Sequence, residues 1–292
     1  MFKGSIVALV TPMEANGDVD WDALERLLGW HLEQGTDGIV PMGTTGESAT
    51  LGVDDHLKVI ERTVAVVAKQ VPVIAGTGAN ATWEAIHQTR RAEQLGADAC
   101  LLVTPYYNRP TQAGLVAHYK ALAEAAAGPL VLYNVPPRTA CDMLPETVAE
   151  VAQFDAVVGI KEACGDAERV ADIKALVNDD FVILSGEDAQ TLRMLELGAM
   201  GTISVTANVL PRQMSEFCSA FLAGDVQRAA VMDADLQRMH AALFIESSPT
   251  PTKWALQEMG MIGPGIRLPL LPLSADKHAV LRAELEFAGC LQ

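Results

Sequence analysis

A lysine stands inside an apolar segment that otherwise has the composition of a buried strand. The run from Val157 to Cys164, VVGIKEAC, is apolar until Lys161. With the two-residue period of a strand, Val157, Gly159 and Lys161 share one face, and small Gly159 leaves room there, so we expect Lys161 to point inward. Burial disfavours the charged ammonium, and the neutral amine attacks carbonyl carbon. The run predicts a Schiff-base nucleophile, although a lysine that reaches water or pairs with a carboxylate is an equally good interpretation of this segment alone.

Two other apolar runs end in side chains that suit the same chemistry. One ends in Tyr106 and Tyr107, and the next ends in Tyr133 followed by the segment NVPPR up to Arg138. A tyrosine hydroxyl beside a Schiff-base lysine can relay the protons that carbinolamine dehydration requires. An arginine can bind a carboxylate through two parallel hydrogen bonds. A single tyrosine is more often a half-buried packing residue, so the coincidence at strand ends favours function.

A glycine- and threonine-rich turn, GTTGE at residues 43–47, ends the run that begins at Gly38. It lacks the lysine that follows the second glycine of a phosphate-binding P-loop. Closely spaced glycines and threonines present backbone N–H groups and hydroxyls that suit a carboxylate. Taken alone, such a turn is more often structural than functional.

Short runs rich in Val, Ile and Leu alternate with helical patterns through the first three quarters of the chain. Helical spacing is seen at Leu24, Leu27, Leu28 and His31, which fall at i, i+3, i+4 and i+7. Eight such βα units predict a (β/α)8 TIM barrel in residues 1–224, whose active site is built by the loops that follow the strands. The eight runs begin at Ser5, Gly38, Val71, Ala99, Pro129, Val157, Val182 and Gly201.

The strand pattern stops near Gly224, and three helical patterns follow it. They predict a small C-terminal helical domain in residues 225–292, packed tightly on the barrel because no linker separates the two parts. In this domain Lys253 is expected to be a solvated helix charge. The preceding stretch, 247–251, is expected to be a rigid loop without catalytic consequence.

Composition restricts the partners. The net charge of −16 comes from 37 acidic and 21 basic residues, which argues against nucleic acid and anionic membranes. The five cysteines are scattered and read as free thiols of a reducing compartment. No signal peptide or membrane-spanning run is found, so a cytoplasmic protein is expected. Without HExxH clusters or a GxGxxG fingerprint, neither a metal nor a nicotinamide cofactor is expected.

Four motifs taken together carry a resemblance to a known family. With GTTGE, TPYYNRP, YNVPPRT and GIKEACGD, the chain resembles the dihydrodipicolinate synthase and N-acetylneuraminate lyase family from about Phe2 to its C-terminal helices. The resemblance implies that Lys161 forms an imine with pyruvate and that Tyr133 relays protons. Thr44 and Tyr107 complete the relay, with Tyr107 donated by a neighbouring chain.

The resemblance also implies how substrates are bound. Thr45 and the backbone near Ile203 contact pyruvate, and Gly186 lies beside the site of the second substrate. Arg138 binds the carboxylate of that substrate, L-aspartate 4-semialdehyde, and favours a synthase because the sialic-acid lyases of the family do not usually have an arginine here. The alternatives are another pyruvate-dependent aldolase or lyase acting on a sugar acid or 2-keto acid, and a keto-acid sensor without catalysis. The presence of Lys161, Tyr133 and Thr44 argues against the sensor.

Regulation and assembly are further implications of the resemblance. Family members inhibited by L-lysine bind it between two barrels, and homotetramers built as dimers of dimers are expected. Glu84 would pair with the α-amino group of lysine and His56 with its side-chain ammonium, although His56 could also be a surface helix histidine. Val53 stands where sensitive enzymes often place a histidine, which predicts weaker inhibition. The matching positions are Ser48, Ala49, His56, Asn80, Glu84 and Tyr106.

Overall fold

The computed structural model describes residues 2–291, and each of the eight predicted runs contains a strand. The strands are short, from three to six residues, and are buried almost throughout. They are β1 (Gly4–Ala8), β2 (Gly38–Val40), β3 (Ile74–Gly76), β4 (Ala99–Val103), β5 (Leu130–Asn134), β6 (Val157–Glu162), β7 (Val182–Ser185) and β8 (Gly201–Ser204).

All strand pairs of the sheet are parallel, in the order β2-β1-β8-β7-β6-β5-β4-β3. A parallel bridge between Ile39 and Val73 joins the two edges and closes the sheet into a barrel. Parallel strands need covered faces, which explains their continuous apolar composition. The predicted TIM barrel is confirmed.

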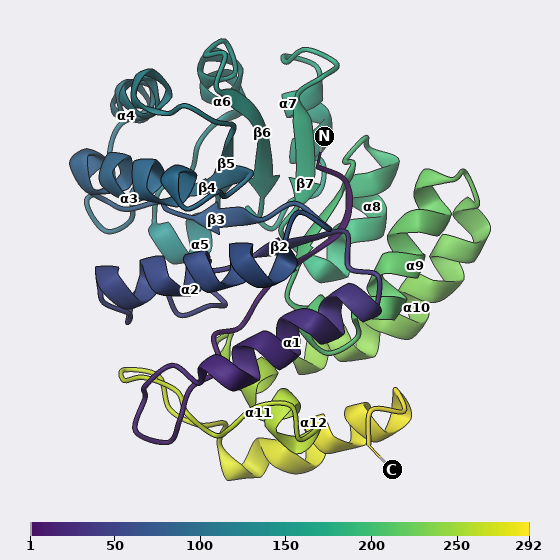
Figure 1. The fold of residues 1–292 in the computed structure, drawn as a ribbon. Coiled ribbons are helices and arrows are strands. Elements are labelled where there is room, and N and C mark those ends of the chain that lie inside the picture. Colours follow the sequence, from purple (N-terminus) through teal and green to yellow (C-terminus); the bar gives the residue numbers. More distant parts are fainter. Residues whose placement is uncertain (1, 292) are drawn as a thin grey trace.

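Helices ring the strands and cover their outer faces (Figure 1). The helices are α1 (Trp21–Glu33), α2 (Val53–Val67), α3 (Thr82–Gln94), α4 (Gln112–Ala125), α5 (Pro136–Thr139), α6 (Pro145–Val151), α7 (Arg169–Lys174), α8 (Thr191–Glu196), α9 (Pro211–Leu222), α10 (Val226–Ala242), α11 (Thr250–Glu258) and α12 (Ala275–Phe287), with 3-10 turns η1 (Asp188–Gln190) and η2 (Thr206–Asn208). The helical stripe predicted from Leu24 to His31 is buried on α1.

Two apolar clusters make up the core, one on each face of the barrel sheet. The larger cluster lies between the strands and the helices, and the smaller one fills the barrel interior. The inner cluster comprises Ile6, Ala8, Val40, Ile74, Ala99, Leu101, Val131, Tyr133, Val135, Ala163, Val182, Leu184 and Ile203. A residue's membership of the inner or outer cluster therefore tells which way its side chain points.

Three helices follow Gly224, as the sequence predicts, and Figure 1 shows α11 and α12 together at one side of the barrel. Helix α10 packs against α9, the last barrel helix, and α12 packs against both α10 and α11. Because the helices continue one packed layer, a domain boundary at residue 224 stays a prediction. Within residues 2–291, each helix is too short or too polar to span a bilayer.

Candidate active site

Lys161 and Tyr133 face each other across two neighbouring strands. Tyr133 of β5 pairs in register with Lys161 of β6, and the Lys161 side chain lies inside the barrel with 6% of the residue exposed. Its Nζ is 4.4 Å from the centroid of the Tyr133 ring. The register and the burial thus bring a primary amine and a phenol together near the ends of two strands, where barrel active sites form.

The inward direction of Lys161 is as predicted, but the strand does not alternate regularly. Val157 packs in the outer cluster and Val158 packs against the inner one, the reverse of the prediction. The cause is an irregularity in which Leu130 pairs with Val157 while the next residue of β5 pairs with Gly159. A bulge of this kind inserts one residue and shifts the parity of the strand.

Gly159 and Gly186 are both required by close contacts, in different ways. A Cβ on Gly159 would lie 2.4 Å from the carbonyl oxygen of Val182, so this glycine admits the neighbouring strand rather than leaving room for Lys161 as predicted. A Cβ on Gly186 would lie 2.9 Å from Lys161 Cε and 2.7 Å from Ala163 Cβ. Gly186 therefore leaves the space that the Lys161 side chain occupies.

Glu187 is a site residue that the sequence reasoning missed. Burial raises the pKa of its carboxyl, whereas the charges of Lys161 and Arg138 lower it and that of Asp188 raises it further. The pKa of Glu187 therefore responds to the charges of both the Lys161 amine and the predicted carboxylate-binding arginine. The signal in the sequence was its position directly after Gly186, at the end of the seventh run.

A cavity of about 340 Å³ joins the strand ends to the predicted effector residues. Thr44, Val135 and Arg138 line one part of it, and Ser48, Ala49, His56, Glu84 and Tyr106 line the other. Val135 lies two residues after Tyr133 and belongs to the same inner cluster. The predicted relay threonine, the predicted carboxylate ligand and most of the predicted effector set thus border one continuous space.

Arg138 contacts the stretch that was expected to have no catalytic consequence. Its Nη2 donates to the carbonyl oxygen of Ser248 at 3.4 Å, and the peptide between Ser248 and Pro249 is cis. Residues 247–249 precede α11, which already includes Thr250 and Pro251, and the Ser248 carbonyl helps to orient the arginine that is predicted to bind a substrate carboxylate. The absence of a catalytic consequence for this stretch stays a prediction.

Seven predicted site residues do not line this cavity: Lys161, Tyr133 and Gly186, described above, and the four that follow. Thr45 is buried in the turn after β2, and Ile203 is buried in the barrel interior on β8. The Asn80 carbonyl accepts a hydrogen bond from Asn108 Nδ2. Tyr107 is 89% exposed with a φ of 73°, an uncommon backbone conformation for a bulky residue. Within one chain, its side chain is presented to the outside.

His56 is held in one orientation at the effector end of the cavity. Its Nε2 lies 2.7 Å from the carbonyl oxygen of Gly76, which can only accept, so Nε2 carries the proton. Burial lowers the pKa of His56, and the hydrogen bond to Gly76 opposes that shift. In the neutral ring, Nδ1 is an acceptor and suits an ammonium donor.

Lys253 is buried, and the prediction of a solvated charge is wrong. Its Nζ forms an ion pair with Glu47, and the two side chains are 5% and 0% exposed. The other Glu47 oxygen accepts the backbone N–H of Arg267 at 3.0 Å. Burial lowers the pKa of Lys253, while the negative charge of Glu47 raises it. The C-terminal helices are thereby tied to the turn that carries Thr44.

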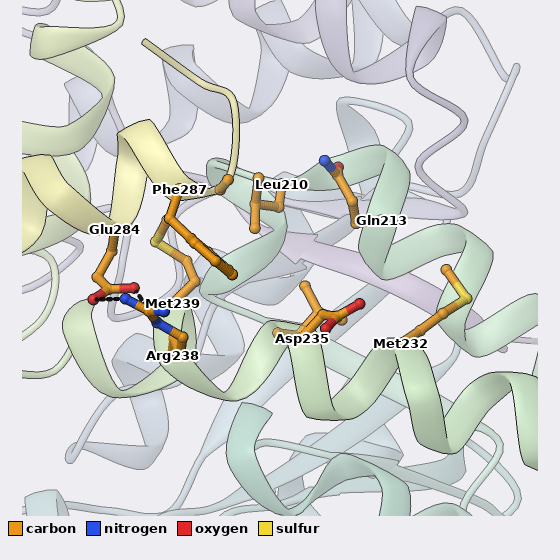
Figure 2. Close-up of a pocket in the computed structure, with 10 residues that line it drawn as sticks. Leu210, Gln213, Met232, Asp235, Arg238, Met239, Glu284 and Phe287 are labelled. Atoms are coloured by element: carbon orange, nitrogen blue, oxygen red, sulfur yellow. Dashed lines mark hydrogen bonds and ion pairs between the residues drawn. The ribbon is translucent and has the colours of Figure 1, made fainter.

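A second cavity, of about 330 Å³, lies among α9, α10 and α12 (Figure 2). Its walls include Leu210, Met239 and Phe287, and Arg238 stacks on Phe287 while it pairs with Glu284. No predicted site residue lines it. Elsewhere in residues 2–291, no three His, Cys, Asp or Glu side chains are grouped as a metal site would require.

The fold and the buried amine define a class of protein, the (β/α)8-barrel enzymes that capture carbonyl compounds on a lysine. Within that class, a model of the Dihydrodipicolinate synthetase family matches residues 1–288. The chain belongs to this family, and the resemblance stated from four motifs is confirmed.

Full-length relatives agree with this assignment. The chain is 54% identical over 291 residues to the 4-hydroxy-tetrahydrodipicolinate synthase of Ectopseudomonas mendocina, with 100% of both chains covered. A crystal structure of the chloride-inhibited dihydrodipicolinate synthase of Acinetobacter baumannii with pyruvate matches at a TM-score of 0.98 and 50% identity, covering 100% of both chains. The lysine-bound synthase of Cyanidioschyzon merolae matches at 0.96 and 38%, covering 99% of both. The prediction of an enzyme is confirmed.

Breaking the buried pair should destabilise the fold. Lys253→Met leaves Glu47 charged and buried without its partner, and we expect the free energy of unfolding to fall by about 3–5 kcal/mol. The double variant Glu47→Gln/Lys253→Met removes both charges and should recover much of that loss. Urea denaturation at pH 7 measures both. Lys277→Met is the control, because the Lys277 pair with Asp276 is exposed and should contribute less than about 1 kcal/mol. Equal stability of Lys253→Met and the control would contradict a buried pair.

Proposed function

We propose that the chain is a 4-hydroxy-tetrahydrodipicolinate synthase that condenses pyruvate with L-aspartate 4-semialdehyde in the diaminopimelate route to lysine. The amine of Lys161 adds to the ketone of pyruvate, water leaves, and the resulting imine loses a methyl proton to become an enamine. The enamine carbon attacks the aldehyde. The amino group of the second substrate then adds to the imine carbon, closes the ring and releases Lys161.

The reaction requires a proton relay during imine formation and groups that bind the carboxylates of the two substrates. Tyr133, beside the Lys161 amine, relays protons during carbinolamine dehydration, and Thr44 connects it to Tyr107 of a second chain. Thr45 and the backbone at Ile203 bind the pyruvate carboxylate. Arg138, held by Ser248, binds the carboxylate of the aldehyde substrate.

The observation that carries the proposal is the contact between Lys161 and Tyr133. The amine is 4.4 Å from the ring centroid of a tyrosine that is itself buried. A buried lysine in a purely structural role would pair with a carboxylate, as Lys253 does with Glu47. Lys161 forms no ion pair within residues 2–291 and instead faces an aromatic ring, so its amine is not paired with a carboxylate.

Borohydride reduction in the presence of pyruvate tests the imine. One pyruvyl adduct should map to Lys161 by peptide mass analysis, and Lys161→Ala should acquire none. Arg138→Ala should keep the adduct but raise the KM for aspartate semialdehyde about 100-fold, the effect of losing a charge-assisted contact. An adduct without condensation would indicate another pyruvate-dependent aldolase, and the absence of any adduct would exclude the imine mechanism.

The active form should contain at least two chains, and a homotetramer built as a dimer of dimers is part of the proposal. The exposed Tyr107 side chain supports it, because a polar aromatic in an uncommon backbone conformation suits an interface better than solvent. The effector residues border a cavity at the same side, beside Tyr106. A second barrel placed there would complete both sites.

Subunit mixing tests the donated tyrosine. Tyr107→Phe and Lys161→Ala should each be nearly inactive alone, but a mixture should regain activity, since about a quarter of the sites in randomly exchanged dimers combine Lys161 of one chain with Tyr107 of the other. Condensation rate after exchange is the measurement, with sedimentation confirming the dimer. A fully active monomer, or a mixture without recovery, would rule out the donated tyrosine.

L-Lysine is the proposed inhibitor, bound where the cavity reaches Glu84 and His56. Glu84 carries the charge that attracts the α-amino group. The pKa of Tyr106 is raised mainly by burial and further by the negative charge of Glu84. Neutral His56, with its proton fixed on Nε2, accepts the side-chain ammonium through Nδ1. Exposed Val53 at the rim adds no polar contact, so inhibition should require millimolar lysine.

Inhibition should weaken when Glu84 is neutralised. We expect Glu84→Gln to raise the lysine concentration for half-inhibition about tenfold or more, because a hydrogen bond to a charged group is lost. Because burial lowers the pKa of His56 below its usual 6.5, inhibition should persist as the pH falls to about 6. Glu61→Gln, on an exposed position of α2, is the control. A few contacts of this kind correspond to binding in the millimolar range. Constant activity up to about 10 mM lysine would therefore reject the effector site.

A further inference from the structure

We propose that Glu162, on the outer face of β6, is a positioning residue for the reaction, because it fixes Asn134 and thereby the register that places Tyr133 against Lys161. This inference rests on the proposed function. Glu162 does not touch the barrel interior. Its side chain lies on the opposite face of the strand from Lys161, with no exposed surface.

The contact between Glu162 and Asn134 joins the two strands directly behind the reacting pair. Asn134 pairs with Glu162 in the register, one residue after Tyr133 pairs with Lys161. Asn134 Nδ2 donates to Glu162 at 3.1 Å and 3.2 Å, to its two oxygens. Glu162 Oε1 also accepts the backbone N–H of Cys164 at 2.8 Å, which fixes the chain as it leaves β6.

A second carboxylate and an arginine complete the buried network. Asn134 Nδ2 donates to Asp142 Oδ1 at 2.9 Å. Asn134 Oδ1 accepts the backbone N–H of Met143 at 3.0 Å. Arg169 of α7 donates to both oxygens of Asp142, at 3.1 Å and 3.0 Å. Asn134 therefore lies between two acids: Asp142 pairs with an arginine, and Glu162 has no ion pair within residues 2–291.

The protonation of Glu162 decides whether the network is complete. Burial raises the pKa of Glu162 to about 7, opposed by the hydrogen bonds from Asn134 and Cys164 and by the charge of Arg169. The other titratable groups around it are Asp142 and the Cys164 thiol, whose pKa burial raises to about 11. An ionised Glu162 accepts from both N–H donors. A protonated Glu162 turns one of these acceptor oxygens into an O–H donor, so it accepts more weakly from Asn134.

This geometry makes the alignment of Lys161 and Tyr133 sensitive to Glu162. Both reacting residues are the immediate chain neighbours of the hydrogen-bonded pair, so a shift of either strand end moves the amine relative to the phenol. Misplacement of reacting groups by about 1 Å reduces rates by up to about 100-fold. The binding of pyruvate, which Glu162 does not contact, should change less.

The first test is Glu162→Gln, compared with Glu150→Gln on an exposed position of α6. Wild-type kcat should fall as the pH decreases through about 7. Glu162→Gln should lower kcat about tenfold at pH 8, leave the KM for pyruvate nearly unchanged and lose that acid limb, since the amide cannot ionise. The control should match wild type. A normal kcat, or a reduced kcat with the acid limb intact, would overturn the proposal.

A second variant keeps Glu162 and changes its surroundings. Arg169→Gln removes a cation that favours the ionised carboxyl, so the acid limb should move to higher pH. An unmoved limb would contradict the proposal even if Glu162→Gln did not fold. Pyruvate trapping and condensation are measured on the wild type in the same series. If either fails, the proposed function is overturned. If both succeed but the variants keep the kcat and acid limb of the wild type, only the role of Glu162 is overturned.

Discussion

The register between β5 and β6 is the constraint on which the candidate site depends. It sets Tyr133 against Lys161 inside the barrel and Asn134 against Glu162 outside it. A slip of one residue in a strand moves every side chain to the other face, which here would take the amine out of the barrel. The irregularity at Val157 and Val158 is therefore significant, because it resets the parity of β6 just before the lysine.

A second constraint acts on the turn after β2, from a part of the chain more than 200 residues away. Glu47 has a φ of 60° and is fully buried, and it is held by Lys253 and by the backbone of Arg267. The Arg267 guanidinium adds contacts to the carbonyls of Gly17 and Thr50. Through these contacts the C-terminal part of the chain holds the turn that carries Thr44.

The sequence was informative wherever a local pattern decides the structure. Eight apolar runs predicted eight strands, and the lysine inside one run predicted an inward amine. The bulge escaped prediction because a strict two-residue period cannot represent an inserted residue. Lys253 was misassigned because its partner, Glu47, lies 206 positions away and leaves no local signal. Glu187 was missed for a similar reason, since the burial that raises its pKa and the charges of Lys161 and Arg138 that lower it arise only on folding.

The same turn connects the reaction with its proposed regulation. Thr44 and Ser48 lie on one compact segment, in which the Gly43 carbonyl accepts from the N–H of Gly46 and of Ser48, and both side chains border the continuous cavity. A ligand held at Ser48 and Ala49 would contact the segment that positions Thr44. Coupling between the two sites then requires only that this turn, anchored by Glu47, have two arrangements that the effector distinguishes.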